Sequence, residues 1–122
     1  MALAQNIMAG GFSSGQAKAI NGRIASTVSA AGTVITDATD LLADISKVST
    51  VASGAGVQLA NGEIGDSQIV YNAGANTLKV YPDTSTNAIN QIAAGGAHSL
   101  ATNTACVYYK LSTTQWVAMV SA

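Results

Sequence analysis

Few side chains in this sequence combine the type and spacing that chemistry requires. His98 is the only histidine, and no Cys, Asp or Glu lies near it in the sequence. Metal sites and general-base catalysis pair a histidine with further ligands, or with a nucleophile and an orienting carboxylate. Asp66 or Cys106 could approach it only through the fold. We therefore expect His98 to occupy a strand or loop position at the surface or at a subunit contact, and not to be catalytic.

Cys106 is the only cysteine, which excludes an intrachain disulfide and fits synthesis in a reducing compartment. It lies among β-forming residues in "TACVYYKL", where a buried, small apolar residue is the common case. A reactive thiolate needs a positive neighbourhood, and only Lys110 is close in the sequence. The sequence predicts a buried thiol without a chemical role.

Two further patterns have features of known sites but lack the residues that those sites need. Residues 10–17, "GGFSSGQA", have the glycine spacing of a phosphate-binding loop, but glutamine and alanine stand where lysine and a hydroxyl residue are required. Asp37, Asp40 and Asp44 have helical spacing instead of the alternating ligands of a calcium loop. We predict no catalytic, cofactor or metal site, and no enzyme.

The composition indicates a surface that a partner covers. Charged residues make up 9% of the 122 residues, whereas soluble domains average about 25%. The net charge is −1 and the five basic residues are scattered, which disfavours nucleic-acid binding. No apolar run approaches the roughly 18 residues of a membrane span, and the start lacks the basic region of a secretory signal. We expect a homo-oligomer that binds neither nucleic acid nor membrane.

The first 35 residues are expected to form an arm with one short helix. Residues 1–35 are rich in Ala, Ser and Gly, and a short helix at 16–20 would end at Asn21-Gly22. Such an arm would gain order by docking on its own body or on something else. Residues 36–45, "TDATDLLADI", carry apolar residues at i, i+3, i+4 and i+7, which predicts a second short helix at the start of the body.

From Ser46 onward the apolar pattern has a period of two, with turn residues at short intervals. This pattern predicts a mainly β body, a sandwich or barrel of seven to eight short strands. The predicted strands are residues 46–52, 56–60, 67–72, 77–82, 88–92, 97–101, 105–111 and 115–121.

The alternation of side chains also predicts which strand faces are buried. Leu78 and Val80 share one face and are expected to point inward, with Lys79 and Tyr81 on the other. The last two strands are largely apolar on both faces. Either one face is core and the other a subunit interface, or both are buried within one domain. The candidate interface residues are Tyr108, Trp116, Val117 and Met119.

Two segments, "GDSQIVYNAGANTLKVYP" and "AINQIAAGGAHSLATNTACVYYKLSTTQWVAM", carry a resemblance. The outline is a strand ending in Asn72, a Gly74-Ala75-Asn76 loop, a strand ended by Pro82, and a last hairpin with a tryptophan. It resembles small virion proteins of tailed bacteriophages, of the head-decoration (cement) or head-fibre type, over roughly residues 45–120. Asn and Gly would supply left-handed turn conformations in the loop. The chain departs from the outline after Pro82 and at Asn103, which stands in place of a glycine.

The resemblance implies a jelly-roll-like body, residues 36–122, that forms a homotrimer and is preceded by the arm, residues 1–35. It implies a non-enzymatic capsid decoration or cement protein without cofactors, whose partners are the phage major capsid protein and further copies of itself. It would be made in the host cytoplasm and lie on the capsid surface of the virion. The candidate capsid-docking residues of the arm are Ile7, Met8, Phe12 and Ile20.

The sequence is also compatible with two other functions. A head- or tail-fibre module that binds a receptor would use the loop 72–76 and exposed tyrosines to contact host glycans, although tyrosines in strands more often pack across the sheet. A small cupin-like metal enzyme would need more ligands than the single histidine.

Overall fold

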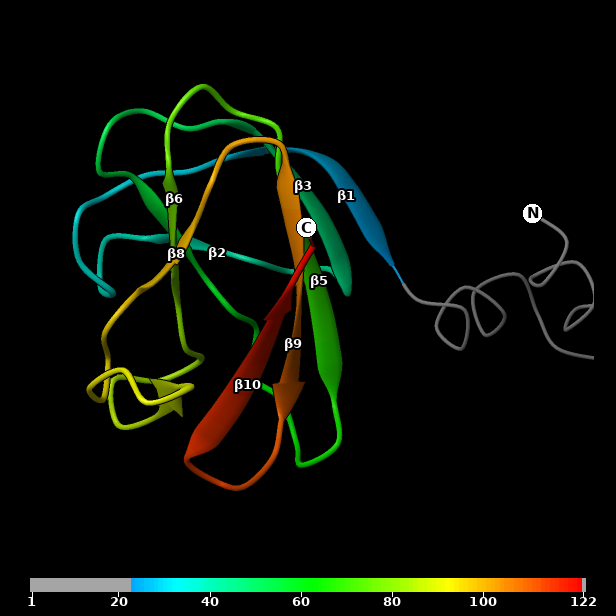
Figure 1. Ribbon diagram of the computed structural model, residues 1–122, viewed down its shortest axis with the longest axis vertical. Coiled ribbons are helices and arrows are strands. Elements are labelled where there is room, and N and C mark those ends of the chain that lie inside the picture. Colours follow the sequence, from blue (N-terminus) through cyan, green and yellow to red (C-terminus); the bar gives the residue numbers. More distant parts are fainter. Residues whose placement is uncertain (1–22, 122) are drawn as a thin grey trace, which may run out of the picture.

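Ten β-strands in two facing sheets make up the part of the chain that this computed structural model describes, residues 23–121 (Figure 1). No helix occurs within that part. The strands are β1 (Ile24–Ser29), β2 (Thr39–Asp40), β3 (Ile45–Thr50), β4 (Gly56–Gln58), β5 (Ser67–Asn72), β6 (Leu78–Tyr81), β7 (Ala88–Ile89), β8 (His98–Leu100), β9 (Thr104–Lys110) and β10 (Gln115–Val120).

The first six strands alternate between the two sheets. β1, β3 and β5 pair in parallel in the six-stranded sheet, and β2, β4 and β6 pair in parallel in the four-stranded sheet. Each strand pair with its connections therefore forms one coil that stacks on the coil before it, as in a β-solenoid. Ile24, Ile45 and Ile69 occupy the same position in successive coils.

The last four strands close the end of this stack. β8 pairs antiparallel to β6, and β9 pairs antiparallel to β5. β10 forms a hairpin with β9, and the short β7 lies parallel to β10 at the edge. The six-stranded sheet has the order β1-β3-β5-β9-β10-β7, and the smaller sheet has the order β2-β4-β6-β8.

The expected mainly β class is confirmed, and each of the eight predicted strands overlaps one of the strands β3 to β10. The connections differ from a jelly roll. A jelly roll joins antiparallel strands through Greek keys, whereas the first six strands here stack in parallel coils. The register of parallel strands depends on the loops that return the chain between sheets, and a period of two does not encode it.

The predicted helix at residues 36–45 is wrong. A single turn at Val34–Asp37 is followed by β2, which adds to β4. Leu41 donates its backbone N–H to Gln58 and is buried, while Leu42 is 87% exposed, although one helical face would have held both leucines. Backbone pairing with a neighbouring coil has overridden the local helical period. The other predicted helix, at 16–20, lies outside the described residues.

The expected arm boundary after residue 35 is also wrong, because part of the arm belongs to the body. β1 pairs along its length with β3, so the first coil begins at Ile24. The expected boundary falls in the turn between β1 and β2. Alanine and serine had suggested a loose segment, but β1 also carries the apolar residues Ile24 and Val28, which the low-complexity composition concealed.

The core lies between the two sheets. Leu78 and Val80 are fully buried, as predicted. Tyr81, expected on the outer side with Lys79, is buried as well, and its hydroxyl donates to the carbonyl of Thr33 at 2.9 Å. The buried apolar cluster consists of Leu41, Val48, Val51, Val57, Leu59, Val70, Leu78, Val80, Ile89, Leu100, Cys106, Tyr108 and Trp116.

Candidate interaction surface

The outward side of the six-stranded sheet carries a continuous apolar row. Side chains alternate along a strand, so residues paired in register across the sheet point to the same side. Pairing of β1 with β3, β3 with β5, β5 with β9 and β9 with β10 aligns one apolar residue from each strand. The row is Ile24, Ile45, Ile69, Val107 and Met119.

Three larger or half-buried side chains flank this row. Tyr71 and Tyr109 are 36% and 37% exposed, and Val117 pairs with Tyr109 and is half-buried. Lys47, which pairs with Tyr71, is the one charged residue that these strands place on this side. We call the following set the outer face: Ile24, Ile45, Ile69, Tyr71, Val107, Tyr109, Val117 and Met119.

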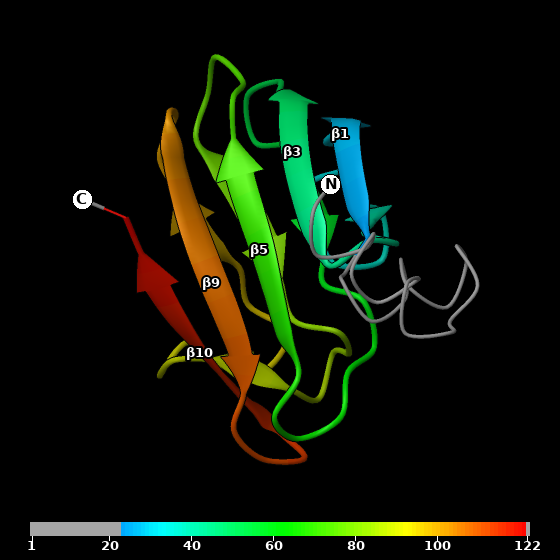
Figure 2. The ribbon, with the colours of Figure 1, turned by 90° about the vertical axis from the view of Figure 1, so that its right-hand side faces the viewer.

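The outer face is open within the described part of the chain. In Figure 2 no other segment of residues 23–121 lies in front of β3, β5 and β9. Met119 is 53% exposed and Ile24 is 70% exposed, so the row is open at both of its ends. Two interpretations were possible for β9 and β10. Within residues 23–121, each of these strands has one face in the core and one face that no other segment covers, so burial of both faces within the domain is excluded there.

The predicted interface residues divide between the two sides of the sheet. Val117 and Met119 lie on the outer face. Tyr108 and Trp116 are fully buried in the core of the chain itself, so they have no surface to offer a second copy. The reason is the alternation, since neighbours such as Trp116 and Val117 point to opposite sides. The predicted docking residues Ile7, Met8, Phe12 and Ile20 lie outside the described residues.

A buried ion pair lies at the inner side of the same sheet. Lys110 donates from Nζ to Asp83 Oδ2 at 2.8 Å and to the carbonyl of Gly62 at 2.7 Å. Asp83 Oδ1 accepts from Asn87 Nδ2 at 2.6 Å and from Trp116 Nε1 at 2.9 Å. Burial raises the pKa of Asp83, but the hydrogen bonds from Lys110, Asn87 and Trp116 outweigh it and bring the pKa below its usual value. The carboxylate stays ionised and fully bonded, which is a structural arrangement.

Sequence patterns do not predict this pair, although they contain half of its signal. Lys110 shares a strand face with Cys106 and Tyr108 by the period of two, so a buried cysteine already implied a buried lysine. Asp83 directly follows Pro82 and has the composition of a turn residue. Its contact with a strand 27 residues further along has no local sequence signal.

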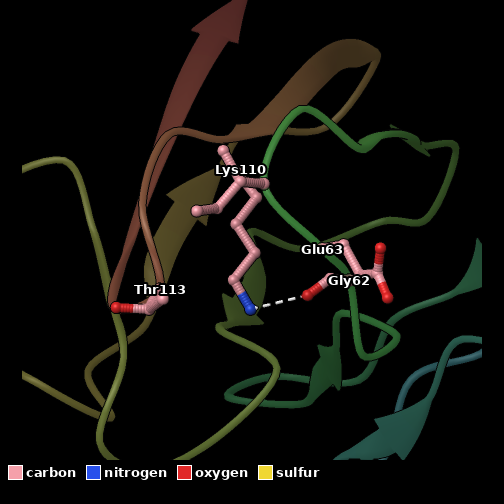
Figure 3. Close-up of a pocket in the computed structure, with 5 residues that line it drawn as sticks. Gly62, Glu63, Lys110 and Thr113 are labelled. Carbon is pink, nitrogen blue, oxygen red and sulfur yellow. Dashed lines mark hydrogen bonds between the residues drawn. The ribbon is translucent and has the colours of Figure 1, made fainter.

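A hollow of about 490 Å³ lies beside the ion pair and is lined by Gly62, Glu63, Ile64, Lys110 and Thr113. Figure 3 shows the ammonium of Lys110 directed at the carbonyl of Gly62, while the carboxylate of Glu63 points away from it. The ammonium of Lys110 therefore donates its hydrogen bonds to acceptors within the protein. The side chains that line the hollow therefore offer a ligand no free cation.

His98, Tyr108 and Cys106 meet between the sheets without forming a reactive set. His98 Nδ1 lies 2.9 Å from the hydroxyl of Tyr108, and the two rings pack edge to face. Burial lowers the pKa of His98 and raises the pKa of the Cys106 thiol, so each favours its neutral form. The prediction of a buried Cys106 is confirmed. His98 is half-buried on β8 and contacts a residue of its own chain.

Asn72 is a buried structural residue. Its side-chain amide donates to the carbonyls of Asn76 and Leu100, both at 2.9 Å, and its oxygen accepts from the backbone N–H of Gly74 at 2.9 Å. The side chain is fully buried. Asn72 therefore fixes the loop that follows β5, and it has no hydrogen-bonding group left for a glycan.

The expected left-handed turn does not occur at Gly74. Among the described residues, positive φ values are found elsewhere, including Asn103 at 61°. Gly74 is needed for space instead, because a Cβ there would lie 2.6 Å from the side chain of Val51. Asn103 adopts the left-handed conformation, which asparagine tolerates better than most residues. Pro82 ends β6 as predicted.

The three aspartates with helical spacing in the sequence, Asp37, Asp40 and Asp44, are all exposed. No group of three or more His, Cys, Asp or Glu side chains suited to a metal ion occurs within residues 23–121. The same residues include no helix with the length and apolar character required to cross a bilayer. Comparison of the chain with protein families, with curated proteins and with solved structures finds no match in any of the three.

Proposed function

We propose that this chain is a non-enzymatic structural protein of a tailed-bacteriophage virion, a decoration or cement protein that binds and stabilises the assembled capsid shell. The observation that carries the structural role is the contrast in how side chains are used. Asp83, Lys110 and His98 are bonded to partners within the chain, while the apolar outer face is open. A contiguous apolar patch of this kind is typical of a protein–protein contact.

The bacteriophage assignment depends on the sequence resemblance over roughly residues 45–120. Its central motif has a physical role, because Asn72 and Gly74 allow the loop after β5 to pack closely on β3 and β8. In this proposal the motif serves the fold of the loop and not the binding of a ligand. In this proposal the partners are the major capsid protein and further copies of the chain, assembled as a trimer on the virion surface after synthesis in the host cytoplasm.

A cement protein stabilises a shell by binding the assembled form more tightly than the free subunits. In this proposal the N-terminal segment makes the shell contact through Ile7, Met8, Phe12 and Ile20. These four residues are apolar in a segment that consists mostly of small and polar residues, which suits docking into pockets between capsid subunits.

The direct test compares virions with and without this protein. Deletion of the gene is expected to lower the temperature at which heads release their DNA, and purified protein added back is expected to restore it. A chain carrying Phe12→Ser and Ile20→Ser should fail to restore it. Heads that resist heat equally well without the protein would contradict the cement role.

A second candidate is a receptor-binding module of a head or tail fibre. The parallel stack of β1, β3 and β5 favours it, because coil architectures form extended surfaces for binding. Tyr71 and Tyr109 are the exposed tyrosines that could contact a sugar ring. Electron microscopy of labelled virions separates the candidates: label spread over the head supports cement, and label confined to a fibre tip supports an adhesin.

A further inference from the structure

We propose that the outer face is the surface through which copies of this chain pack against each other. The occupant is a second copy of the same sheet face. The inference concerns a two-fold contact, because a face that packs on its own copy pairs two chains, and a trimer would need a further contact. It deepens the self-association part of the proposed function and does not depend on capsid binding. Its test therefore uses the purified protein alone.

The charge pattern of the outer face suits a self-complementary contact. When identical surfaces meet, every charge on one copy comes near the same charge on the other, so charged faces repel their own copies. The strands present only Lys47 on this side, at one margin of the face. The central row is formed by aliphatic side chains and Met119, which carry no charge that would oppose self-association.

The area of the face is close to what a specific contact needs. Five strands spaced about 4.8 Å apart, each about six residues long at roughly 3.3 Å per residue, outline a flat area on the order of 500 Å². Side-chain relief increases the accessible area toward the roughly 600 Å² per partner at which specific interfaces begin. Two such faces can pack about 10 Å apart with their side chains interdigitated, as sheets do in a sandwich.

The concentration of apolar groups on this face distinguishes it from the rest of the surface. Leu42, Ile64 and Leu111 are also well exposed, but they lie in three separate connections between strands. Single exposed apolar residues are normal, whereas an aligned set across five strands requires an explanation. Burial between copies also explains how a chain with 9% charged residues can remain in solution.

Light scattering of the full-length chain and of matched lysine variants tests the inference. The wild type is expected to have a mass of at least two 12.2 kDa chains over about 1–100 µM. Ile69→Lys combined with Met119→Lys puts like charges in contact, so the dissociation constant should rise by at least about 100-fold and the single-chain mass should appear. Leu42→Lys adds a positive charge outside the face and should leave the mass unchanged.

Each outcome either supports or overturns packing through the outer face. A full-length chain that stays at the single-chain mass would overturn the inference, as would a folded double variant that assembles like the wild type. If the lysines prevent folding, as circular dichroism would reveal, Ile69→Thr with Met119→Thr repeats the test with strand-forming residues. Assembly that behaves as expected alongside failure to protect virions would contradict the capsid role alone.

Discussion

The two sides of the six-stranded sheet use the same strands for opposite purposes. On the inner side, the ionisable and reactive side chains, such as Lys110 and Cys106, are buried and stabilise the fold. On the outer side, residues with unreactive apolar side chains, such as Ile69 and Met119, lie on a face that no other described segment covers. Reactive residue types are therefore a poor guide to function in this molecule, and the free surface is a better one.

Two adjacent residues of β9 show this difference between the inner and outer sides most clearly. Tyr108 is fully buried and bonded to His98, while Tyr109 is 37% exposed on the outer face. The same residue type has two roles because successive side chains of a strand point to opposite sides. Substitutions on the inner side should change stability, and substitutions on the outer face should change association.

The largest expected effect is at the inner ion pair. Asp83→Ala leaves the ammonium of Lys110 buried without its counter-charge and removes the acceptor of Trp116. Loss of one partner of a buried pair costs about 3–5 kcal/mol of unfolding free energy, which urea unfolding would measure. Glu63→Ala, an exposed carboxylate at the neighbouring hollow, is the control and should change stability by less than about 0.5 kcal/mol. Equal effects of the two substitutions would contradict the structural role of the pair.

The two tyrosines of β9 give a matched comparison of the faces. Tyr108→Phe removes the hydrogen-bonding partner of the half-buried His98 and should lower the unfolding free energy by about 1–3 kcal/mol. Tyr109→Phe removes a hydroxyl from the outer face and should change it by less than about 0.5 kcal/mol. Denaturation should be followed under conditions where both variants are dissociated. A larger effect at Tyr109 would show that the assignment of inner and outer sides is reversed.

Stability should fall in acid because of groups on the inner side. His98 has a pKa below its usual 6.5 when folded, so the unfolded chain binds more protons and stability declines as the pH falls below about 6.5. Asp83 also has a lowered pKa, so its contribution is present above the unfolded value of 3.8 and is lost as the pH falls through the lower folded value. Melting temperatures across pH would show both declines.

His98→Gln separates the two contributions to acid sensitivity. The variant keeps a polar side chain near Tyr108 but cannot titrate, so its melting temperature should be flat between about pH 6.5 and pH 5. The decline in the Asp83 range should persist. A variant that loses stability over the upper range as the wild type does would exclude His98 as the cause.

The smallest expected effect concerns Ser46 on the inner side of β3. Its hydroxyl is buried and has no hydrogen-bonding partner among the described residues. Ser46→Ala removes that unpaired group and should leave stability unchanged or raise it by up to about 1 kcal/mol. Ser49→Ala, at an exposed position of the same strand, is the comparison. A clear loss of stability in Ser46→Ala would mean that the hydroxyl does have a partner.

Sequence patterns predicted the elements of this fold better than their arrangement. The strands at 67–72 and 78–81 follow from alternating apolar residues and from the turn residues around them. The parallel stacking of β1, β3 and β5 did not follow, because the coils differ in loop length and the period of two says nothing about which strands pair. The helix predicted at 36–45 failed because its competing interaction was with a distant strand, β4.

The sequence predicted part of the outer face. The apolar character of both sides of the last hairpin pointed to Val117 and Met119, which do lie on the outer face. Ile24, Ile45 and Ile69 complete the row only through pairings that join separate coils. Contacts of that kind depend on tertiary register, so residues far apart in sequence gave no local sign that they share a surface.

Hydroxyl-radical footprinting of the native protein tests most directly whether the outer face is hidden between copies. In the single chain, Tyr109 and Met119 are 37% and 53% exposed, and Leu111, in the turn between β9 and β10, is 59% exposed. We expect Tyr109 and Met119 to be protected at micromolar concentration, and to become labelled on dilution, while Leu111 is labelled throughout. Labelling of Met119 that is as fast as that of Leu111 and independent of concentration would contradict the account.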